Sequence, residues 1–252
     1  GPRGWIEALG LAALALASCL AYYGRVLAGR ARFDLPAFAA ALQQSGLSIL
    51  PAITLVMIAI GLILGHQVEG ILTQFDLPVV VILTVAFVII IEVLPVLVGI
   101  LVAGRAGVAL AVRQATLLAT GEMDGLLVCG IEPLPFTLAP VLLAMLLMSF
   151  AFLVWGTLVT FAVAGAWLWA STGVAPALFL EMLTSALTPG ALVEALVKPL
   201  LFAVLIALIA TLNGIGAGRR PGGIAGAATG TMIGAVTAIL VTDLLYIVLV
   251  RV

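Results

Sequence analysis

The stretch PVVVILTVAFVIIIEVLPVLVGILVA, residues 78–103, decides the fold class of this chain. Glu92 is its single charge, and its apolar residues form a continuous block instead of alternating with polar ones. A helix of about 20 residues crosses a hydrocarbon core of about 30 Å, and a helix as long as this stretch would reach ~39 Å. Backbone polar groups must be hydrogen-bonded internally in a bilayer, which leaves helices or closed barrels. The block pattern therefore predicts a transmembrane α-helix.

The composition extends this prediction to the whole chain. Of the 252 residues, 65% are hydrophobic and 8% are charged, and the mean hydropathy is +1.39. A soluble domain carries about 25% charged residues, so this chain has too few charges to cover a water-facing surface. The net charge of −1, without a large basic cluster, gives no indication of nucleic-acid binding. Cys19 and Cys129 lie in separate apolar surroundings and indicate neither a disulfide framework nor a metal site.

We expect an all-α integral membrane fold that forms a single domain over residues 1–252. Residues 5–29 form an apolar helix whose Tyr22, Tyr23 and Arg25 are typical of a headgroup boundary. We interpret this helix as interfacial, with a full crossing as the alternative. Five transmembrane helices are expected after it, at residues 47–65, 78–103, 136–169, 196–213 and 223–250. Polar turns connect them, and the one from residue 171 to 194 has room for a short helix.

The arginines predict the orientation. They lie before the first span, between the second and third, and between the fourth and fifth: Arg25, Arg30, Arg32, Arg105, Arg113, Arg219 and Arg220. With five spans, all of these fall on one side of the membrane, which the positive-inside rule makes cytoplasmic. The N-terminus is then cytoplasmic and the C-terminus external.

Residues 105–133 are expected to form a cytoplasmic segment between the second and third spans. The small residues around Gly104, Arg105 and Gly107 predict a corner with close helix packing. Thr120 is placed as the N-cap of a short helix, with Glu122 and Asp124 in its first turn, where the helix dipole favours anions. Gly130 and Pro133 are expected to end it. This helix is either a contact for a partner protein or a solvated loop helix.

Three charged residues fall inside predicted spans, namely Glu92, Lys198 and Asp243. A charge at a helix centre costs about 2.5–3.5 kcal/mol on insertion scales, so Glu92 should face a cavity, a partner or a headgroup. Pro95 removes a backbone hydrogen bond and favours a break in the same helix. Glu92 could instead be buried and protonated, with only a packing role. Lys198 could extend its ammonium along the helix to the membrane interface. In the last span, Gly226, Gly230 and Gly234 form a ladder that permits close helix contact, within the subunit or at a dimer interface.

The pattern of residues 92–133 resembles the MlaE-type permeases of MCE-associated ABC transporters. Glu92, Pro95-Val96-Leu97, Ala103-Gly104-Arg105, Gly107, Thr120, Glu122-Met123-Asp124, Leu126, Gly130-Ile131 and Pro133 carry the match. Gly61, Leu64 and Gln67 at the end of the first span, Lys198, and the glycines that open the last span also fit. The resemblance covers residues 45–250. Two positions depart from the family pattern: Arg113 stands where a glutamate is usual, and Val141 where an arginine is usual.

The resemblance implies a homodimeric permease in a bacterial inner (plasma) membrane. It implies a cytoplasmic ABC ATPase as partner, an MCE-domain protein that is periplasmic or membrane-anchored, and in many systems a STAS-domain subunit. The segment that includes Thr120, Glu122, Asp124, Gly130, Glu132 and Pro133 would dock on the ATPase. Glu92, Pro95, Lys198 and Gln67 would lie near the path of membrane lipids, of which phospholipid is the expected class.

The chain contains no G-x-x-x-x-G-K-[ST] phosphate loop, so we expect ATP and Mg²⁺ to bind the partner ATPase and no cofactor or metal to bind this chain. An ion- or proton-coupled secondary transporter or channel is the alternative function, although the ionisable residues within the spans are too few for an obvious relay. An intramembrane enzyme is disfavoured because there is one histidine and no catalytic dyad is recognisable. No catalytic residue is predicted.

Overall fold

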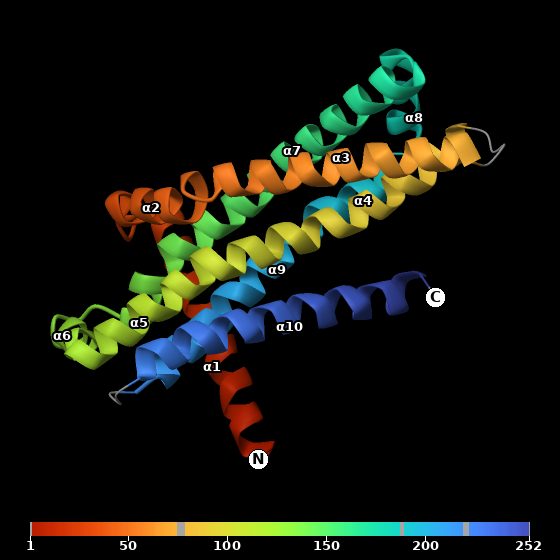
Figure 1. Cartoon of the computed structure of the whole chain (residues 1–252). Helices are drawn as coiled ribbons and strands as arrows, with labels where there is room; N and C mark the ends of the chain where they lie inside the picture. The colour runs from red at the N-terminus through yellow and green to blue at the C-terminus, as the bar shows by residue number, and fades with distance from the viewer. Residues whose placement is uncertain (1, 75–78, 187–188, 219–221, 252) are drawn as a thin grey trace. The chain divides into compact units, whose positions relative to one another are not determined.

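The computed structural model describes all residues except 1, 75–78, 187–188, 219–221 and 252, and the described residues are helical, without a β-strand. Figure 1 shows the helices in chain order. They are α1 (Pro2–Leu27), α2 (Leu35–Leu42), the π-helical turn η1 (Gln43–Leu47), α3 (Leu50–Gln74), α4 (Val79–Val102), the π-helical turn η2 (Ala103–Gly107), α5 (Val108–Thr120), α6 (Glu122–Val128), α7 (Pro133–Thr172), α8 (Pro176–Ala186), α9 (Pro189–Gly216) and α10 (Gly223–Arg251).

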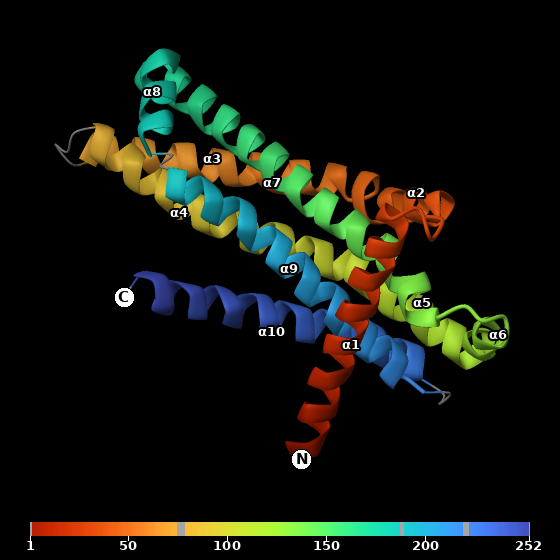
Figure 2. The same cartoon turned by 180° about the vertical axis from the view of Figure 1, so that it is seen from behind.

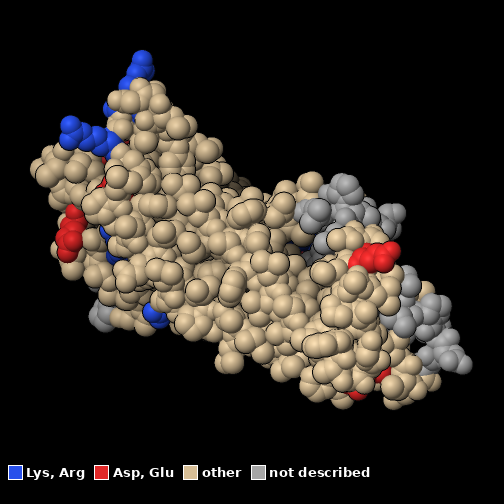
Figure 3. Space-filling model, turned by 90° about the horizontal axis from the view of Figure 1, so that it is seen from above, with Lys and Arg blue, Asp and Glu red and all other residues tan. Residues whose placement is uncertain are grey.

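Six helical stretches among the described residues are long and apolar enough to cross a membrane. They are Ile6–Leu27, Leu35–Gln74, Glu92–Thr120, Pro133–Thr172, Val193–Gly216 and Gly223–Leu249. Three of them contain the predicted spans 47–65, 136–169 and 196–213, and Gly223–Leu249 covers the last predicted span up to residue 249. The stretch Glu92–Thr120 covers the predicted span 78–103 only from Glu92 onward, although helix α4 itself begins at Val79. The sixth is α1, which length and composition also permit to cross. Figure 3 shows one face of the molecule, where charged side chains are few and scattered, as a lipid-facing surface requires.

Several predicted boundaries are wrong because helices continue where turns were expected. The small residues at 103–107 form η2, which joins α4 to α5 without a corner. His66, Gln67 and Glu69 were placed in a polar turn but belong to α3, and Glu194 was placed in a loop but belongs to α9. Helix α4 also continues past Pro95, where a break was expected. In membrane helices, neighbouring groups and local adjustments can satisfy the backbone carbonyl that a proline leaves free.

The structure divides into two compact units. Unit 1 comprises Gly1–Ile49, Gly99–Ser149 and Leu201–Val252, and unit 2 comprises Leu50–Val98 and Phe150–Leu200. In unit 1, α5, α9 and α10 pack closely through small residues. A Cβ atom built on Gly107 would lie 2.6 Å from Cγ2 of Ile206, and one on Gly214 would lie 2.9 Å from the carbonyl oxygen of Ala111. These glycines therefore allow helix backbones to approach each other.

In unit 2, glycines likewise allow α3 and α7 to pack closely, and these helices run side by side in Figures 1 and 2. A Cβ on Gly61 would lie 2.6 Å from the carbonyl oxygen of Thr160, and one on Gly65 would lie 2.8 Å from Cβ of Trp167. Helix α8, the short helix for which the sequence left room, places Phe179 against Gly165 of α7. Small residues on one helix thus leave space in which larger side chains of a neighbouring helix pack.

Candidate functional site

A cluster of three charged side chains lies in unit 2, where α4 and α9 each contribute to it; Lys198 is buried, and Glu92 and Glu194 are partly exposed. The ammonium of Lys198 on α9 pairs with Oε2 of Glu92 on α4, and it also lies 3.0 Å from Oε1 of Glu194, one turn earlier on α9. Only 4% of Lys198 is exposed. The ammonium therefore does not extend to an interface, which removes the alternative interpretation of this residue.

The burial of these side chains explains their pairing. An isolated charge in an apolar interior is expensive, and a buried ion pair is tolerated when its geometry is good and its members are hydrogen-bonded. Glu92 and Lys198 are 106 residues apart in sequence and meet through a charge-assisted hydrogen bond. The structure thus brings together two residues that the sequence suggested separately.

Glu194 was not selected from the sequence as a site residue. The sequence did contain a signal for its role, because a glutamate four residues before a lysine forms a favourable ion pair on one face of a helix. It was missed because the residues before Lys198 were interpreted as a loop, whereas α9 begins at Pro189.

Prolines flank the cluster on both helices. Pro95 follows Glu92 by three residues and Pro199 follows Lys198 directly, and both lie buried inside continuous helices. A proline lacks the N–H that the carbonyl four residues earlier would accept, so the hydrogen-bond ladder of each helix is interrupted beside a charge. Gln67, the fourth residue predicted near a lipid path, is exposed on α3. Among the described residues, no hydrogen bond or ion pair links it to the cluster.

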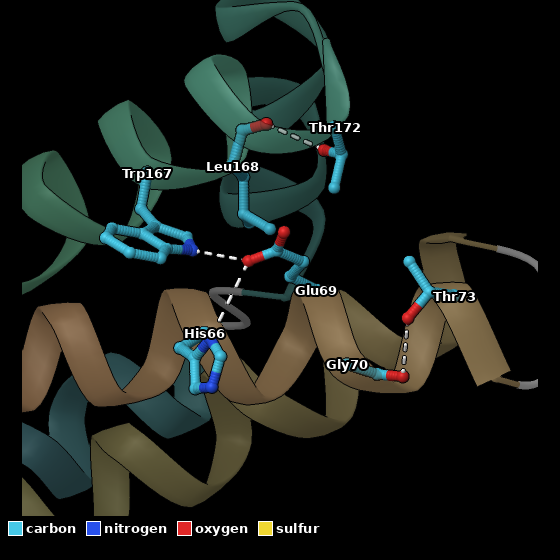
Figure 4. Close-up of polar contacts among 7 residues, drawn as sticks. All are labelled: His66, Glu69, Gly70, Thr73, Trp167, Leu168 and Thr172. Carbon is cyan, nitrogen blue, oxygen red and sulfur yellow. Dashed lines mark hydrogen bonds and ion pairs between the residues drawn. The ribbon is translucent and has the colours of Figure 1, made fainter.

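A second polar contact joins α3 to α7 (Figure 4). Nε1 of Trp167 donates a 2.8 Å hydrogen bond to Oε2 of Glu69, and Nδ1 of His66 lies 3.7 Å from the same oxygen. The His66 ring also stands edge-on to Trp167, with ring centroids 6.0 Å apart. His66 is thus accounted for by packing, and the described residues contain no group of histidine, cysteine or acidic side chains suited to a metal ion.

In unit 1, α5, α6 and α7 form a hairpin whose turns depend on glycine. Gly121 separates α5 from α6 with a φ of +80°, and Gly130 follows α6 with a φ of +75°. Gly121 therefore caps α6, and the prediction of Thr120 as N-cap is wrong. The Thr120 hydroxyl oxygen instead lies 3.1 Å from Thr116 O and 3.0 Å from Oε1 of Glu122, either of which can accept its single hydrogen.

The end of α6 has paired backbone bonds typical of a glycine C-terminus. Gly130 N donates to Leu127 O at 3.0 Å, and Ile131 N donates to Leu126 O at 2.9 Å. Pro133 does not end this element but begins α7, a position that suits its fixed φ and missing N–H. Glu132 precedes it and lies 3.7 Å from Arg25 of α1, an exposed pair that contributes little stability.

Helix α6 has no buried residue. Leu127 is 60% exposed and Val128 is 89% exposed, while Glu122 and Asp124 occupy the first turn. The base of the hairpin is firmly held, since the fully buried Gln114 of α5 donates from Nε2 to Oγ1 of Thr137 of α7 at 3.1 Å. An anchored hairpin thus presents a short helix with uncovered apolar and acidic side chains.

The residues assigned to helix packing differ in what they contact. Gly107 contacts Ile206 of α9, and Gly104 lies 3.4 Å from Sδ of Met232 of α10, as measured from a Cβ built on each glycine. Of the α10 ladder, Gly230 and Gly234 approach Asn213 and Ile209 of α9, whereas Gly226 has no atom within 4 Å of such a Cβ. Arg105 is exposed on η2.

A protein-family model described as Permease MlaE matches residues 38–249. The chain belongs to the MlaE permease family. This match includes the charged cluster, the α5–α6–α7 hairpin and every helix from α3 to α9, while α1 precedes it. MlaE permeases are membrane subunits of ABC-type lipid transport systems, so the chain is a multi-pass inner-membrane transport subunit. A search of curated proteins found no match.

Proposed function

We propose that this MlaE permease forms a homodimer that moves phospholipid, or a related lipid, between the inner membrane and an MCE-domain partner. The observation that carries the proposal is the family match across residues 38–249. The energy source is a separate ATPase, because the sequence has no phosphate-binding loop of its own. A STAS-domain subunit is a further expected partner.

The need for a sheltered path follows from the cost of moving acyl chains through water. Burial of each CH₂ group is worth about 0.8 kcal/mol, so a two-chain lipid cannot leave the bilayer unaided at a useful rate. The Glu92–Lys198 pair of unit 2 is our candidate for the polar part of this path. Charged residues inside a membrane domain are expensive and commonly mark a substrate pathway.

Helix α6 is our candidate for the ATPase contact. It lies in a hairpin between two long helices that are apolar enough to cross the membrane, and Leu127 and Val128 are uncovered there. Exposed apolar side chains beside acidic ones are typical of a protein interface. A rigid connection is needed to transmit work, and the buried Gln114–Thr137 hydrogen bond at the base of the hairpin supports that role.

The proposal is tested by reconstitution with the cognate ATPase and MCE-domain protein. Fluorescent phospholipid in proteoliposomes should exchange with the MCE-domain protein in an ATP-dependent way, and omission of either this chain or the ATPase should abolish the exchange. The detergent-purified permease should have about twice the 25.8 kDa mass of one chain. Proton-dependent uptake by this chain alone, with no effect of the ATPase, would instead support a secondary transporter.

A further inference from the structure

A hollow of about 530 Å³ lies between α7 and α8, within unit 2. Helix α8 lies beside the last turns of α7 in both Figures 1 and 2. The two helices meet at Gly165, since a Cβ atom built on this glycine would lie 3.1 Å from Cε1 of Phe179. The volume falls within the range of about 300–1,000 Å³ that is typical of ligand sites. The hollow shares no residue with the charged cluster on α4 and α9.

The lining of the hollow suits hydrocarbon. Among the described residues that form it, none is charged, and only Thr157 and Trp169 carry a polar side-chain group. The Thr157 hydroxyl already donates a 2.7 Å hydrogen bond to Leu153 O of its own helix. Water needs two to four polar partners, and apolar cavities stay dry. An empty hollow would cost its walls their dispersion contacts. An apolar ligand is therefore the occupant that fits this lining.

The hollow extends lengthwise along α7. Every fourth residue of this stretch of the helix lines it, namely Thr157, Phe161, Gly165 and Trp169. At 1.5 Å per residue, the first and last of these are ~18 Å apart along the helix. One leaflet is half of a hydrocarbon core of about 30 Å. Trp169 is 61% exposed at one end, and tryptophan is typical of a headgroup boundary. The hollow thus has the length of one acyl chain and begins where a headgroup would lie.

We propose that the hollow between α7 and α8 binds one acyl chain of a membrane phospholipid, with the headgroup beside Trp169. Because none of the described lining residues is charged, the site holds the chain without selecting the headgroup. The orientation predicted from the arginines puts this lipid in the external leaflet. The inference goes beyond the proposed function, since it needs the protein in a membrane and does not need ATP-dependent transfer.

Photolabelling of the full-length permease tests the site. The protein is reconstituted in phosphatidylcholine vesicles with a trace of phosphatidylcholine or phosphatidylglycerol that carries a diazirine in one acyl chain. After irradiation, mass spectrometry locates the labelled peptides. Ala162→Phe fills the hollow from an exposed position on its wall. Ala151→Phe makes the same change about three turns earlier on α7, at an exposed alanine that does not line the hollow, and serves as the matched control.

We expect the label to concentrate on residues 157–183, equally with either headgroup. Lipid tails are as apolar as leucine, so packing and not the hydrophobic effect holds the chain. Ala162→Phe should therefore reduce this labelling about tenfold, as expected when a few methylene groups lose their contacts. Ala151→Phe should be labelled like the wild type. Label of equal density on the exposed leucines of α10, or an unchanged level in Ala162→Phe, would indicate ordinary bilayer lipid and overturn the inference.

Two further outcomes are decided by the wild-type protein alone. If Ala162→Phe does not fold, the distribution of label between α7–α8 and α10 in the wild type still supports or overturns the site. Loss of the label when the MCE-domain protein is added would show that a polypeptide segment fills the hollow, which would also overturn the inference. Because no ATPase is present in this experiment, a failure of ATP-dependent transfer would refute the proposed function without changing the labelling result.

Discussion

Lys198 is the only lysine in the chain, and it is buried between two glutamates. Its removal would leave Glu92 and Glu194 without their shared cation in an apolar environment. Breaking a buried ion pair from one side typically costs about 3–5 kcal/mol, much of it for the charge left behind. Replacement of every member by neutral residues of similar volume is far better tolerated.

We therefore predict that Lys198→Met lowers the thermal unfolding midpoint in detergent substantially. The triple variant Lys198→Met, Glu92→Gln, Glu194→Gln should regain most of that loss, because it contains no uncompensated charge. Differential scanning fluorimetry with the endogenous tryptophans measures both. A triple variant less stable than Lys198→Met would show that the three charges stabilise independently.

At this scale, the sequence predicted Glu92 and Lys198 as important because a charge within an apolar run is conspicuous. It did not predict that they pair, since 106 residues separate them and only the packing of α4 against α9 brings them together. Glu194 was missed because its role depends on where α9 begins. Gln67 was selected from a pattern, and the structure places it on an exposed face of α3.

Among the elements, α9 is closely packed against α5 at Gly214. A Cβ on Gly214 would approach the Ala111 carbonyl oxygen and Cβ of Gln114 to 2.9 Å each. Neither neighbour can yield easily, because one is backbone and the other belongs to a fully buried side chain. Gly216 lies two residues further and has no atom within 4 Å of such a Cβ.

Gly214→Ala should destabilise the protein by about 1–3 kcal/mol, the usual cost of overpacking. Gly216→Ala, on the same helix, should have little effect. Thermal unfolding of the two variants in one detergent provides the comparison. Equal stabilities would mean that α5 and α9 can separate without cost.

Helix α6 gives the second prediction at the scale of elements. Its acidic first turn and uncovered apolar residues suit an interface, so Glu122→Lys combined with Asp124→Lys should abolish binding of the ATPase while the permease stays folded. The combination Glu7→Lys and Glu181→Lys reverses the same number of charges at exposed sites on α1 and α8 and should leave binding intact. Co-purification with tagged ATPase is the readout, and normal recovery by the α6 variant would exclude this helix as the contact.

The existence of the helices could be predicted from the apolar runs alone, but several of their ends could not. Glycine and alanine at 103–107 are equally suitable for a turn and for close packing, and the packing of Gly107 against Ile206 settles which occurs. The start of α6 was misplaced by one residue because Thr120 is a good cap in general. The left-handed conformation of Gly121 makes that residue the cap instead.

For the whole molecule, the two cysteines provide a test of orientation. Cys129 follows α6 and is exposed, whereas Cys19 in α1 is fully buried. The distribution of arginines predicts that the α6 hairpin is cytoplasmic. Chemical labelling of the Cys129 thiol therefore shows on which side of the membrane this hairpin lies.

A membrane-impermeant maleimide should label Cys129 in inside-out vesicles and not in intact spheroplasts. Cys129→Ser should abolish labelling in both, since Cys19 remains covered. Labelling from the outside only would reverse the predicted orientation, and with it the side on which the ATPase binds.

The pairing of Glu92 with Lys198 also constrains how the protein is made. Translation proceeds at about 5–20 residues per second, and 106 residues separate the two partners. Glu92 therefore enters the membrane several seconds before its lysine leaves the ribosome. During this interval, the nascent α4 carries an uncompensated carboxyl group, so its release into lipid should be delayed until α9 arrives.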